Sequence, residues 1–262
     1  MPGQAEYSAL NAEQRAALVG RIRGALDTAE TVAMVPVYAA KSASLANAFD
    51  VSVAKALGNG VAFLRPDDEF IRGVFRSFGE SVCDEGEAPK VIWFSGSVRG
   101  GDASDYALLG ELSGDADDAK AGVRFAEALG HLSASDCHFV VGIDAEPPKS
   151  LIRLPKNVSV IWAHDFGGTA FVDLAKGGVL SQAFTRVLAT AEGRRVFSVM
   201  QLEVALRAGA SAFIAESSIR APQRPFIQGS ERRMLFFPLD TLPRRKISVA
   251  VPAEVTPQIY TR

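Results

Sequence analysis

Residues 137–146 read C-H-F-V-V-G-I-D-A-E, an apolar run that ends at two acids. Two other segments have the same form, K-V-I-W-F-S-G-S at 90–97 and V-S-V-I-W-A-H-D at 158–165. Short apolar runs rich in β-branched and aromatic residues predict strands that are buried on both faces. The three segments therefore predict the centre of a sheet covered by other elements on each side.

Amphipathic helical patterns surround these strands. In the segment 66–78, proline and acids suit a first helical turn, where amide hydrogens are exposed. Its apolar face is expected to comprise Ile71, Val74, Phe75 and Phe78. Further helices are expected at 9–28, 44–57, 117–132, 178–191 and 198–209, and further strands at 31–39, 61–64 and 234–237. This alternation predicts an α/β fold, a three-layer α/β/α sandwich with a mostly parallel central sheet.

The composition is that of a globular protein, with 48% hydrophobic and 22% charged residues. The formal net charge of −2 gives no sign of a nucleic-acid partner held by phosphate contacts. The N-terminus is polar and acidic, unlike a signal peptide, and no apolar run approaches the ~20 residues of a membrane helix. We therefore expect a cytoplasmic protein with no membrane partner.

The chain has two cysteines, Cys83 and Cys137, which we expect to make no disulfide framework and which lack zinc-ligand spacing. Cys137 is expected to be a small core residue, with His138 on the opposite face of its strand. Cys83 lies in an acidic stretch that disfavours a thiolate. The three histidines are scattered, so we expect neither a metal nor a cofactor.

The polar strand ends are the segments in which chemistry is expected. In open α/β sheets, ligands bind beyond the carboxyl ends of the strands. Candidate functional residues should therefore lie in 95–105, 144–149 and 164–169.

Two of these strand ends resemble those of caspase-like peptidases (clan CD). V-I-W-F-S-G-S at 91–97 resembles their strand that ends in Ser-Gly-His-Gly and delivers the catalytic histidine. F-V-V-G-I-D-A-E at 139–146 resembles the next strand, which ends in Asp-(Ala or Ser)-Cys and delivers the nucleophile.

Two later segments extend the resemblance. G-G-V-L-S-Q-A-F-T-R-V-L at 177–188 is similar to the family's Gly-x-Phe-Thr-x-x-Leu helix start. A-P-Q-R-P-F-I-Q-G-S-E at 221–231 looks like the Gln-Thr-Pro segment of bacterial metacaspase-like (orthocaspase-like) domains. The resemblance implies a single caspase-like domain over 1–262, with a helical extension at 1–30, a core at 30–240 and a tail at 241–262.

Both catalytic positions implied by the resemblance hold other residues. Ser97 stands where the histidine is expected, and Glu146 stands where the cysteine is expected. A serine hydroxyl does not accept a proton near neutral pH as imidazole does, and an ionised glutamate is a poor nucleophile that would repel an oxyanion. We therefore expect no catalytic residues and a pseudoenzyme, a non-cleaving binding, scaffold or regulatory protein.

A binding function would rest on acids near the same edge. Asp144 matches the acid that helps to receive a basic side chain in Arg/Lys-specific relatives, and Asp102 and Asp105 lie in a neighbouring loop. The candidate partner is a protein or peptide bearing Arg or Lys, or an active homologue. The competing interpretation is that Asp144 only hydrogen-bonds loop amides while the loop acids are solvated.

Two alternatives stay open. His164 ends the strand after Glu146, so Ser97, His164 and Glu146 would be the ingredients of a substituted hydrolytic triad if their geometry allowed it. The chain would instead be a structural subunit if the apolar segment Met234–Phe237 paired across a sheet edge. Either a monomer or a homodimer is expected.

Overall fold

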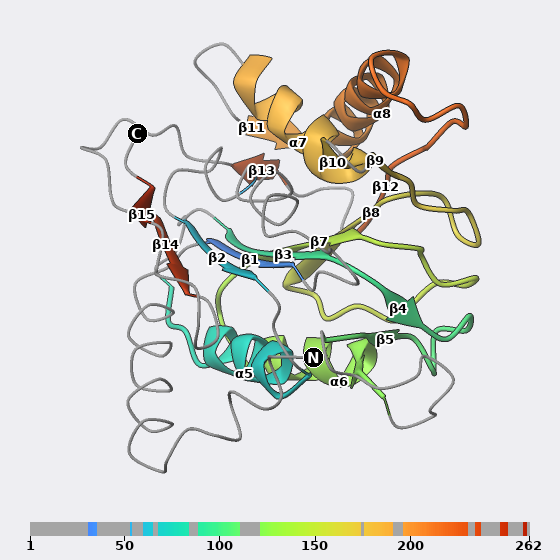
Figure 1. Cartoon of the computed structure of the whole chain (residues 1–262). Coiled ribbons are helices and arrows are strands. Elements are labelled where there is room, and N and C mark those ends of the chain that lie inside the picture. The colour runs from blue at the N-terminus through green and yellow to red at the C-terminus, as the bar shows by residue number, and fades with distance from the viewer. Residues whose placement is uncertain are drawn as a thin grey trace.

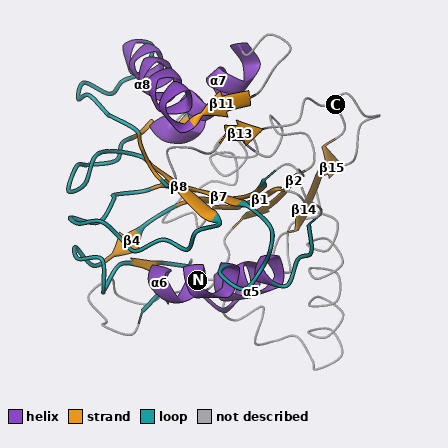
Figure 2. Ribbon diagram, turned by 180° about the vertical axis from the view of Figure 1, so that it is seen from behind, coloured by secondary structure: helices purple, strands orange, loops and turns teal. Residues whose placement is uncertain are grey.

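The computed structural model describes residues 31–35, 53, 60–64, 68–83, 89–110, 121–173, 176–190, 196–229, 234–236, 247–250 and 259–260. Its centre is an eight-stranded sheet with helices on both faces (Figures 1 and 2). The α/β sandwich expected from the sequence is confirmed.

The main sheet has the strand order β12-β8-β7-β3-β1-β2-β14-β15. Its strands are β1 (Thr31–Val35), β2 (Gly60–Leu64), β3 (Lys90–Ser95), β7 (Phe139–Asp144), β8 (Val158–Trp162), β12 (Phe226–Gln228), β14 (Ile247–Ala250) and β15 (Ile259–Tyr260). All neighbours from β8 to β14 are parallel, whereas β12 and β15 pair antiparallel at the two edges. Because β3, β7 and β8 are adjacent and parallel, their carboxyl ends lie at one edge of the sheet.

Among the described residues, three smaller sheets accompany the main one. They consist of β4 (Val98–Arg99), β5 (Ala107–Leu108) and β6 (Val123–Arg124); β9 (Val172–Asp173) and β10 (Gly177–Gly178); and β11 (Val196–Ser198) and β13 (Met234–Phe236). The last pair bears on one alternative above, because the backbone of Met234–Phe236 already pairs antiparallel with β11 of its own chain. That side of the segment is therefore not available for pairing with a second copy.

The helices form one layer on each side of the sheet (Figure 1). One layer holds α5 (Asp68–Gly79) and α6 (Phe125–Leu132), and the other holds α7 (Val179–Thr190) and α8 (Val199–Ala215). Side chains alternate across β3: Val91 and Trp93 join the α7–α8 core, whereas Ile92 and Phe94 join the α5–α6 core. This alternation explains why β3 is apolar at four successive buried positions, Val91 to Phe94.

Trp93 is the largest side chain at the centre of the α7–α8 core. Its ring is stacked on Phe184 with centroids 4.8 Å apart, and it has no exposed surface. The ring lies over Gly142 of β7, where an added Cβ would be 2.1 Å from Trp93 Cε3. Gly142 is therefore the position that leaves room for the indole.

Some predicted boundaries were wrong. α6 begins at Phe125 and not at residue 117, because β6 and a turn with Gly122 at φ 87° precede it. α8 continues past Gly209 to Ala215, because Gly209 lies against Ala183 of α7 and permits close helix packing instead of ending the helix. The buried face predicted for α5 is confirmed at all four positions.

Two predicted helices lie outside the described residues, the one at 9–28 and, except for Val53, the one at 44–57. Of the strand predicted at 31–39, residues 36–39 also lie outside them. The expected core boundary at 240 needs correction. β14 pairs parallel with β2, with Val249 opposite Ala62, so the main sheet includes a strand from the segment that we expected to be a tail.

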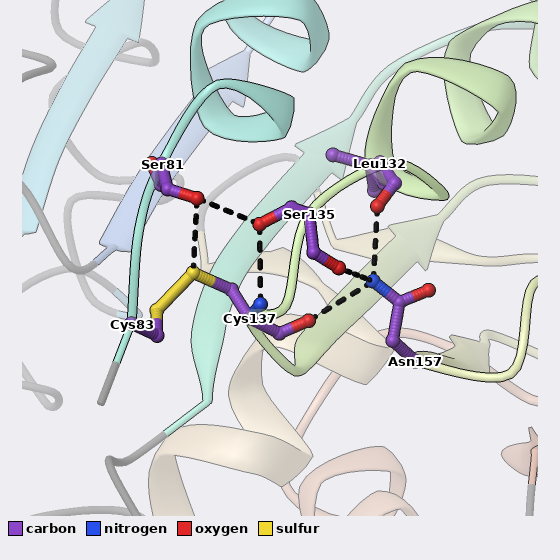
Figure 3. Close-up of a disulfide and its surroundings, with 6 residues drawn as sticks. All are labelled: Ser81, Cys83, Leu132, Ser135, Cys137 and Asn157. Carbon is purple, nitrogen blue, oxygen red and sulfur yellow. Dashed lines mark hydrogen bonds between the residues drawn. A yellow bond between two sulfur atoms is a disulfide. The ribbon is translucent and has the colours of Figure 1, made fainter. Parts of the chain in front are cut away.

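The largest correction concerns the cysteines. Cys83 and Cys137 form a disulfide between positions 54 residues apart (Figure 3). Cys137 is a buried core residue, as expected, but it is not a free thiol. Disulfides are rare in cytosolic proteins, so the bond gives the cytoplasmic location no support, and that location stays a prediction. Within the described ranges, every helix is too short or too polar to cross a bilayer.

Candidate functional site

The carboxyl edge of the sheet brings together the segments singled out from the sequence. Ser95 of β3 is opposite Asp144 of β7, and Ile143 of β7 is opposite Trp162 of β8. Ser97, Glu146 and His164 are each the second residue beyond the end of one of these three adjacent strands. The two positions where catalytic residues would be expected are therefore on neighbouring elements in matching register.

Backbone hydrogen bonds fix both positions. The carbonyl of Ser97 accepts from the amide of Leu109 at 3.1 Å, and the carbonyl of Glu146 accepts from the hydroxyl of Tyr106 at 2.6 Å. Tyr106 is buried, and its pKa is raised well above 10.0, first by burial and then by the charge of Glu146. The carboxylate of Glu146 itself faces solvent, whereas Ser97 is half-buried.

The three loops at this edge are tied to one another. The amide of Lys149 donates to the carbonyl of Gly101 at 2.6 Å, and the amide of Gly167 donates to the carbonyl of Pro148 at 3.1 Å. In the first loop the carbonyl of Asp102 accepts from the amides of Asp105 and Tyr106. The edge therefore has an ordered polar rim.

Asp102, Asp105 and Glu146 are three acids of this rim, and a fourth, Asp165, lies 3.6 Å from Arg207. The first three are exposed, as is Lys149, whose side chain lies against Gly101. Among the described residues, these three acids take part in no ion pair, so their charge is available to a partner.

Asp144 does not join them. It is 3% exposed and lies at the start of α7, where Oδ2 accepts from the amide of Ser181 at 2.9 Å and from its hydroxyl at 2.6 Å. Gly178 covers the carboxylate so closely that an added Cβ would be 2.0 Å from Oδ2. Of the two interpretations offered by the sequence, this geometry matches hydrogen bonding to loop amides, with the difference that the amide belongs to a helix start.

Burial raises the pKa of Asp144 to about 6, although its hydrogen bonds to Ser181 and Leu180 act in the opposite direction. Oδ1 is buried and has no hydrogen-bond partner among the residues that the structure describes. The hydroxyl of Ser181 that donates to Oδ2 also accepts a hydrogen bond from the indole N–H of Trp93 at 2.9 Å, so Trp93, Ser181 and Asp144 form a short hydrogen-bonded chain. The ionised form of Asp144 is therefore disfavoured in the folded protein.

His164 is half-buried, and its ring lies against the following turn. Nδ1 is 3.3 Å from the carbonyl oxygen of Asp165, and an added Cβ at Gly168 would be 2.0 Å from the same nitrogen. In the described part of the chain no hydrogen bond joins His164 to Ser97 or Glu146. The three residues share an edge but do not form a hydrogen-bonded triad.

The sequence reasoning missed Ser181, Trp93 and Tyr106 as residues of this region. Ser181 lies in the first turn of a helix that was expected, but its partner Asp144 comes from a strand 37 residues earlier. Across the described ranges, no three or more His, Cys, Asp or Glu side chains gather as they would around a metal ion.

No family model matches the chain, and no curated protein matches it. Among solved structures, the chain is similar to caspase-1 from Spodoptera frugiperda, with a TM-score of 0.50. The match covers 80% of this chain and 90% of that chain. The chain has a caspase-like fold. At 15% sequence identity, this likeness concerns the fold alone.

A caspase-like fold was the expectation from the four sequence segments, and it is confirmed. The resemblance implied a catalytic pair at the carboxyl ends of β3 and β7, and Ser97 and Glu146 follow these two strands. The roles of individual residues stay predictions.

Proposed function

We propose that this caspase-fold chain does not cleave peptides and instead holds a partner protein at the carboxyl edge of its sheet. The observation that supports the proposal is the pair Ser97 and Glu146, which follow adjacent strands in register where an imidazole and a thiol would be needed. A hydroxyl and a carboxylate do not replace them, because the hydroxyl does not take up a proton near neutral pH as imidazole does, and the carboxylate is a poor nucleophile that would repel an oxyanion.

The chemistry of the rim favours a basic partner. Asp102, Asp105 and Glu146 are exposed around loops that hydrogen bonds hold in place, so an Arg- or Lys-bearing segment would meet three carboxylates without rearranging the backbone. Asp144 contributes no exposed oxygen to this surface and is left out of the proposed contact. The partner is therefore a protein that presents a basic segment, an active caspase-like homologue among the candidates.

The first test measures cleavage. Purified protein is expected to release no fluorophore from Arg- or Lys-containing peptide reporters above the rate of buffer alone. It is also expected to leave Ser97 unlabelled by a fluorophosphonate probe, because within the described part of the chain no base is hydrogen-bonded to its hydroxyl. Turnover that Ser97→Ala or Glu146→Ala abolishes would overturn the proposal in favour of a substituted hydrolase.

The second test measures binding. A fluorescent peptide rich in Arg and Lys is expected to bind the wild-type protein, and Asp102→Asn/Asp105→Asn/Glu146→Gln is expected to weaken that binding roughly tenfold, since exposed ion pairs contribute up to ~1 kcal/mol each. Fluorescence anisotropy measures the affinity of the wild type and of the triple variant at two salt concentrations. The difference between the two affinities should be smaller at high salt.

Asp136→Asn is the matched control for the binding test, because Asp136 is an exposed acid that precedes the amino end of β7. It should leave the affinity unchanged. Equal weakening by this control and by the triple variant would show a response to net charge only, and binding of an acidic peptide with the same affinity would exclude the rim as a basic-segment site.

A further inference from the structure

The disulfide lies at the end of β7 opposite to the polar rim (Figure 3). Cys83 follows α5, and Cys137 comes two residues before β7. The two cysteines differ in exposure: Cys137 has no exposed surface, whereas Cys83 is part-exposed and the side chain of its neighbour Val82 is 89% exposed. We therefore expect a reagent from solvent to reach Cys83 before Cys137.

The turn that carries Cys137 is held by hydrogen bonds as well as by the disulfide. Asn157 Nδ2 lies 2.9–3.0 Å from three carbonyl oxygens, those of Leu132, Ser135 and Cys137, which share its two N–H donors. Ser135 Oγ accepts from the amide of Cys137 at 3.1 Å and donates to the carbonyl of Ser81 at 2.8 Å. These bonds, drawn in Figure 3, link the turn to the segment after α5 without the sulfurs. Breaking the disulfide would leave this connection in place.

The surroundings of Cys137 suit the reduced state too. Its sulfur is 3.5 Å from the carbonyl oxygen of Ser81. A disulfide sulfur carries no hydrogen, so in the oxidised protein this is only a contact. After reduction the thiol would have an acceptor already within range, and burying a satisfied donor costs little.

We propose that Cys83–Cys137 is a reversible thiol–disulfide exchange site that takes a dithiol reductant. A thiolate of the reductant attacks Cys83 Sγ, the bond between the two protein sulfurs breaks, and Cys137 leaves as a thiolate that takes up a proton. The second thiol of the reductant then attacks the mixed disulfide and releases Cys83, which is protonated in turn. The protein gains two electrons and two protons, and the reductant becomes a disulfide.

The sequence next to each cysteine is acidic, and we expect this charge to set a preference among reductants. Three of the four residues after Cys83 are acids, Asp84, Glu85 and Glu87, and exposed Asp136 precedes Cys137. Negative charge repels an approaching anionic thiol and attracts a cationic one, and salt screens both effects. The site is therefore expected to react faster with reductants whose reactive thiol has neutral or positive surroundings.

The first experiment reduces the oxidised full-length protein with dithiothreitol under native conditions and counts free thiols. The rate is expected to rise linearly with reductant concentration and to yield two thiols per chain. Far-UV circular dichroism should be retained, and the Tm should fall by about 10 °C, because removing a long-loop cross-link destabilises but the hydrogen bonds remain. Re-oxidation should restore the original Tm.

Several results would overturn the proposal. A rate independent of reductant concentration would mean that exchange needs prior unfolding, and loss of native circular dichroism on reduction would make the bond purely structural. Two thiols that stay free in the presence of an oxidant would exclude the bond altogether. The double variant Cys83→Ser/Cys137→Ser should melt where the reduced protein melts, and no thiol should appear in it.

A second experiment tests the attacked sulfur and the charge preference. Cysteamine, 2-mercaptoethanol and 2-mercaptoethanesulfonate carry a positive, no and a negative charge, and the rate per thiolate is expected to fall in that order. Acid-quenched mixtures should show the mixed disulfide on Cys83 by peptide mass spectrometry. An adduct on Cys137 would contradict the assignment of the attacked sulfur. Equal rates with the three thiols, together with the same rates in Glu85→Gln/Glu87→Gln as in the wild type, would contradict the charge preference.

Discussion

Asp144→Asn is expected to raise the free energy of unfolding at pH 7 by about 2 kcal/mol. Burial raises the pKa of Asp144 from 3.8 to about 6, a shift of about two units, and each unit corresponds to about 1.4 kcal/mol. At pH 7 the folded protein bears this cost because the carboxylate is ionised but buried. The amide removes the charge, keeps an oxygen for Ser181 and loses part of the attraction to the helix start.

The sign of the pH dependence follows from the same shift. Below about pH 4 both the folded and the unfolded chain hold the proton, so Asp144 costs nothing. Between about pH 4 and 6 the unfolded chain releases its proton while the folded protein keeps it, so the stability of the wild type falls as the pH rises. Above pH 6 the full cost is present. In Asp144→Asn this contribution is absent.

Urea denaturation of both proteins between pH 4 and pH 8 measures the difference directly. The two curves should approach each other at acidic pH and separate toward neutral pH. Ser181→Ala is the companion variant, since it removes the hydroxyl that donates at 2.6 Å and should lower stability at pH 7. A variant Asp144→Asn less stable than wild type at pH 7 would show that the carboxylate is needed as an ion beneath α7.

Gly142→Ala is expected to lower the free energy of unfolding by about 3 kcal/mol or more. The added methyl group would lie 2.1 Å from Trp93 Cε3 and 2.3 Å from Cζ3. The indole cannot move aside easily, because it is stacked on Phe184 and its N–H is bonded to Ser181. Overpacking of a dense core costs roughly 1–3 kcal/mol and more where the neighbours are rigid.

Gly73→Ala is the matched control for this substitution. Gly73 lies in α5, where an added Cβ would have no atom within 4 Å, so alanine should stabilise the helix by roughly 0.5–1 kcal/mol. Denaturant unfolding monitored by tryptophan fluorescence compares the two. If Gly142→Ala changed stability by less than 1 kcal/mol, the close packing of Trp93 on β7 would be wrong.

The parts of the fold that sequence predicts well are those with a strong local signal. β3, β7 and β8 are apolar at successive positions because both faces are covered, and α5 shows its buried face at helical spacing. The start of α6 was missed because a short strand and a glycine turn precede it, and neither has a marked sequence pattern. Long-range pairing was missed for a different reason: nothing local relates Cys83 to Cys137.

The candidate site shows the same division. The sequence placed Ser97, Glu146 and His164 at one edge, because parallel strands that are neighbours must end together. It did not reveal that Asp144 points to α7, since strand parity allows either face until the covering helix is known. Asp144 is on the same face of β7 as Val140 and Gly142. On that face the first turn of α7 brings Ser181 within hydrogen-bond distance of Asp144.

One consequence concerns β7 as a mechanical element. Just before its first residue, a covalent bond fastens it to the end of the α5 segment, and at its last residue a carboxylate fastens it to the first turn of α7. These two attachments lead to opposite helical layers, so β7 connects the sheet to the helices on both of its faces. The two attachments respond to different chemical changes, the covalent one to a reductant and the hydrogen-bonded one to the protonation of Asp144.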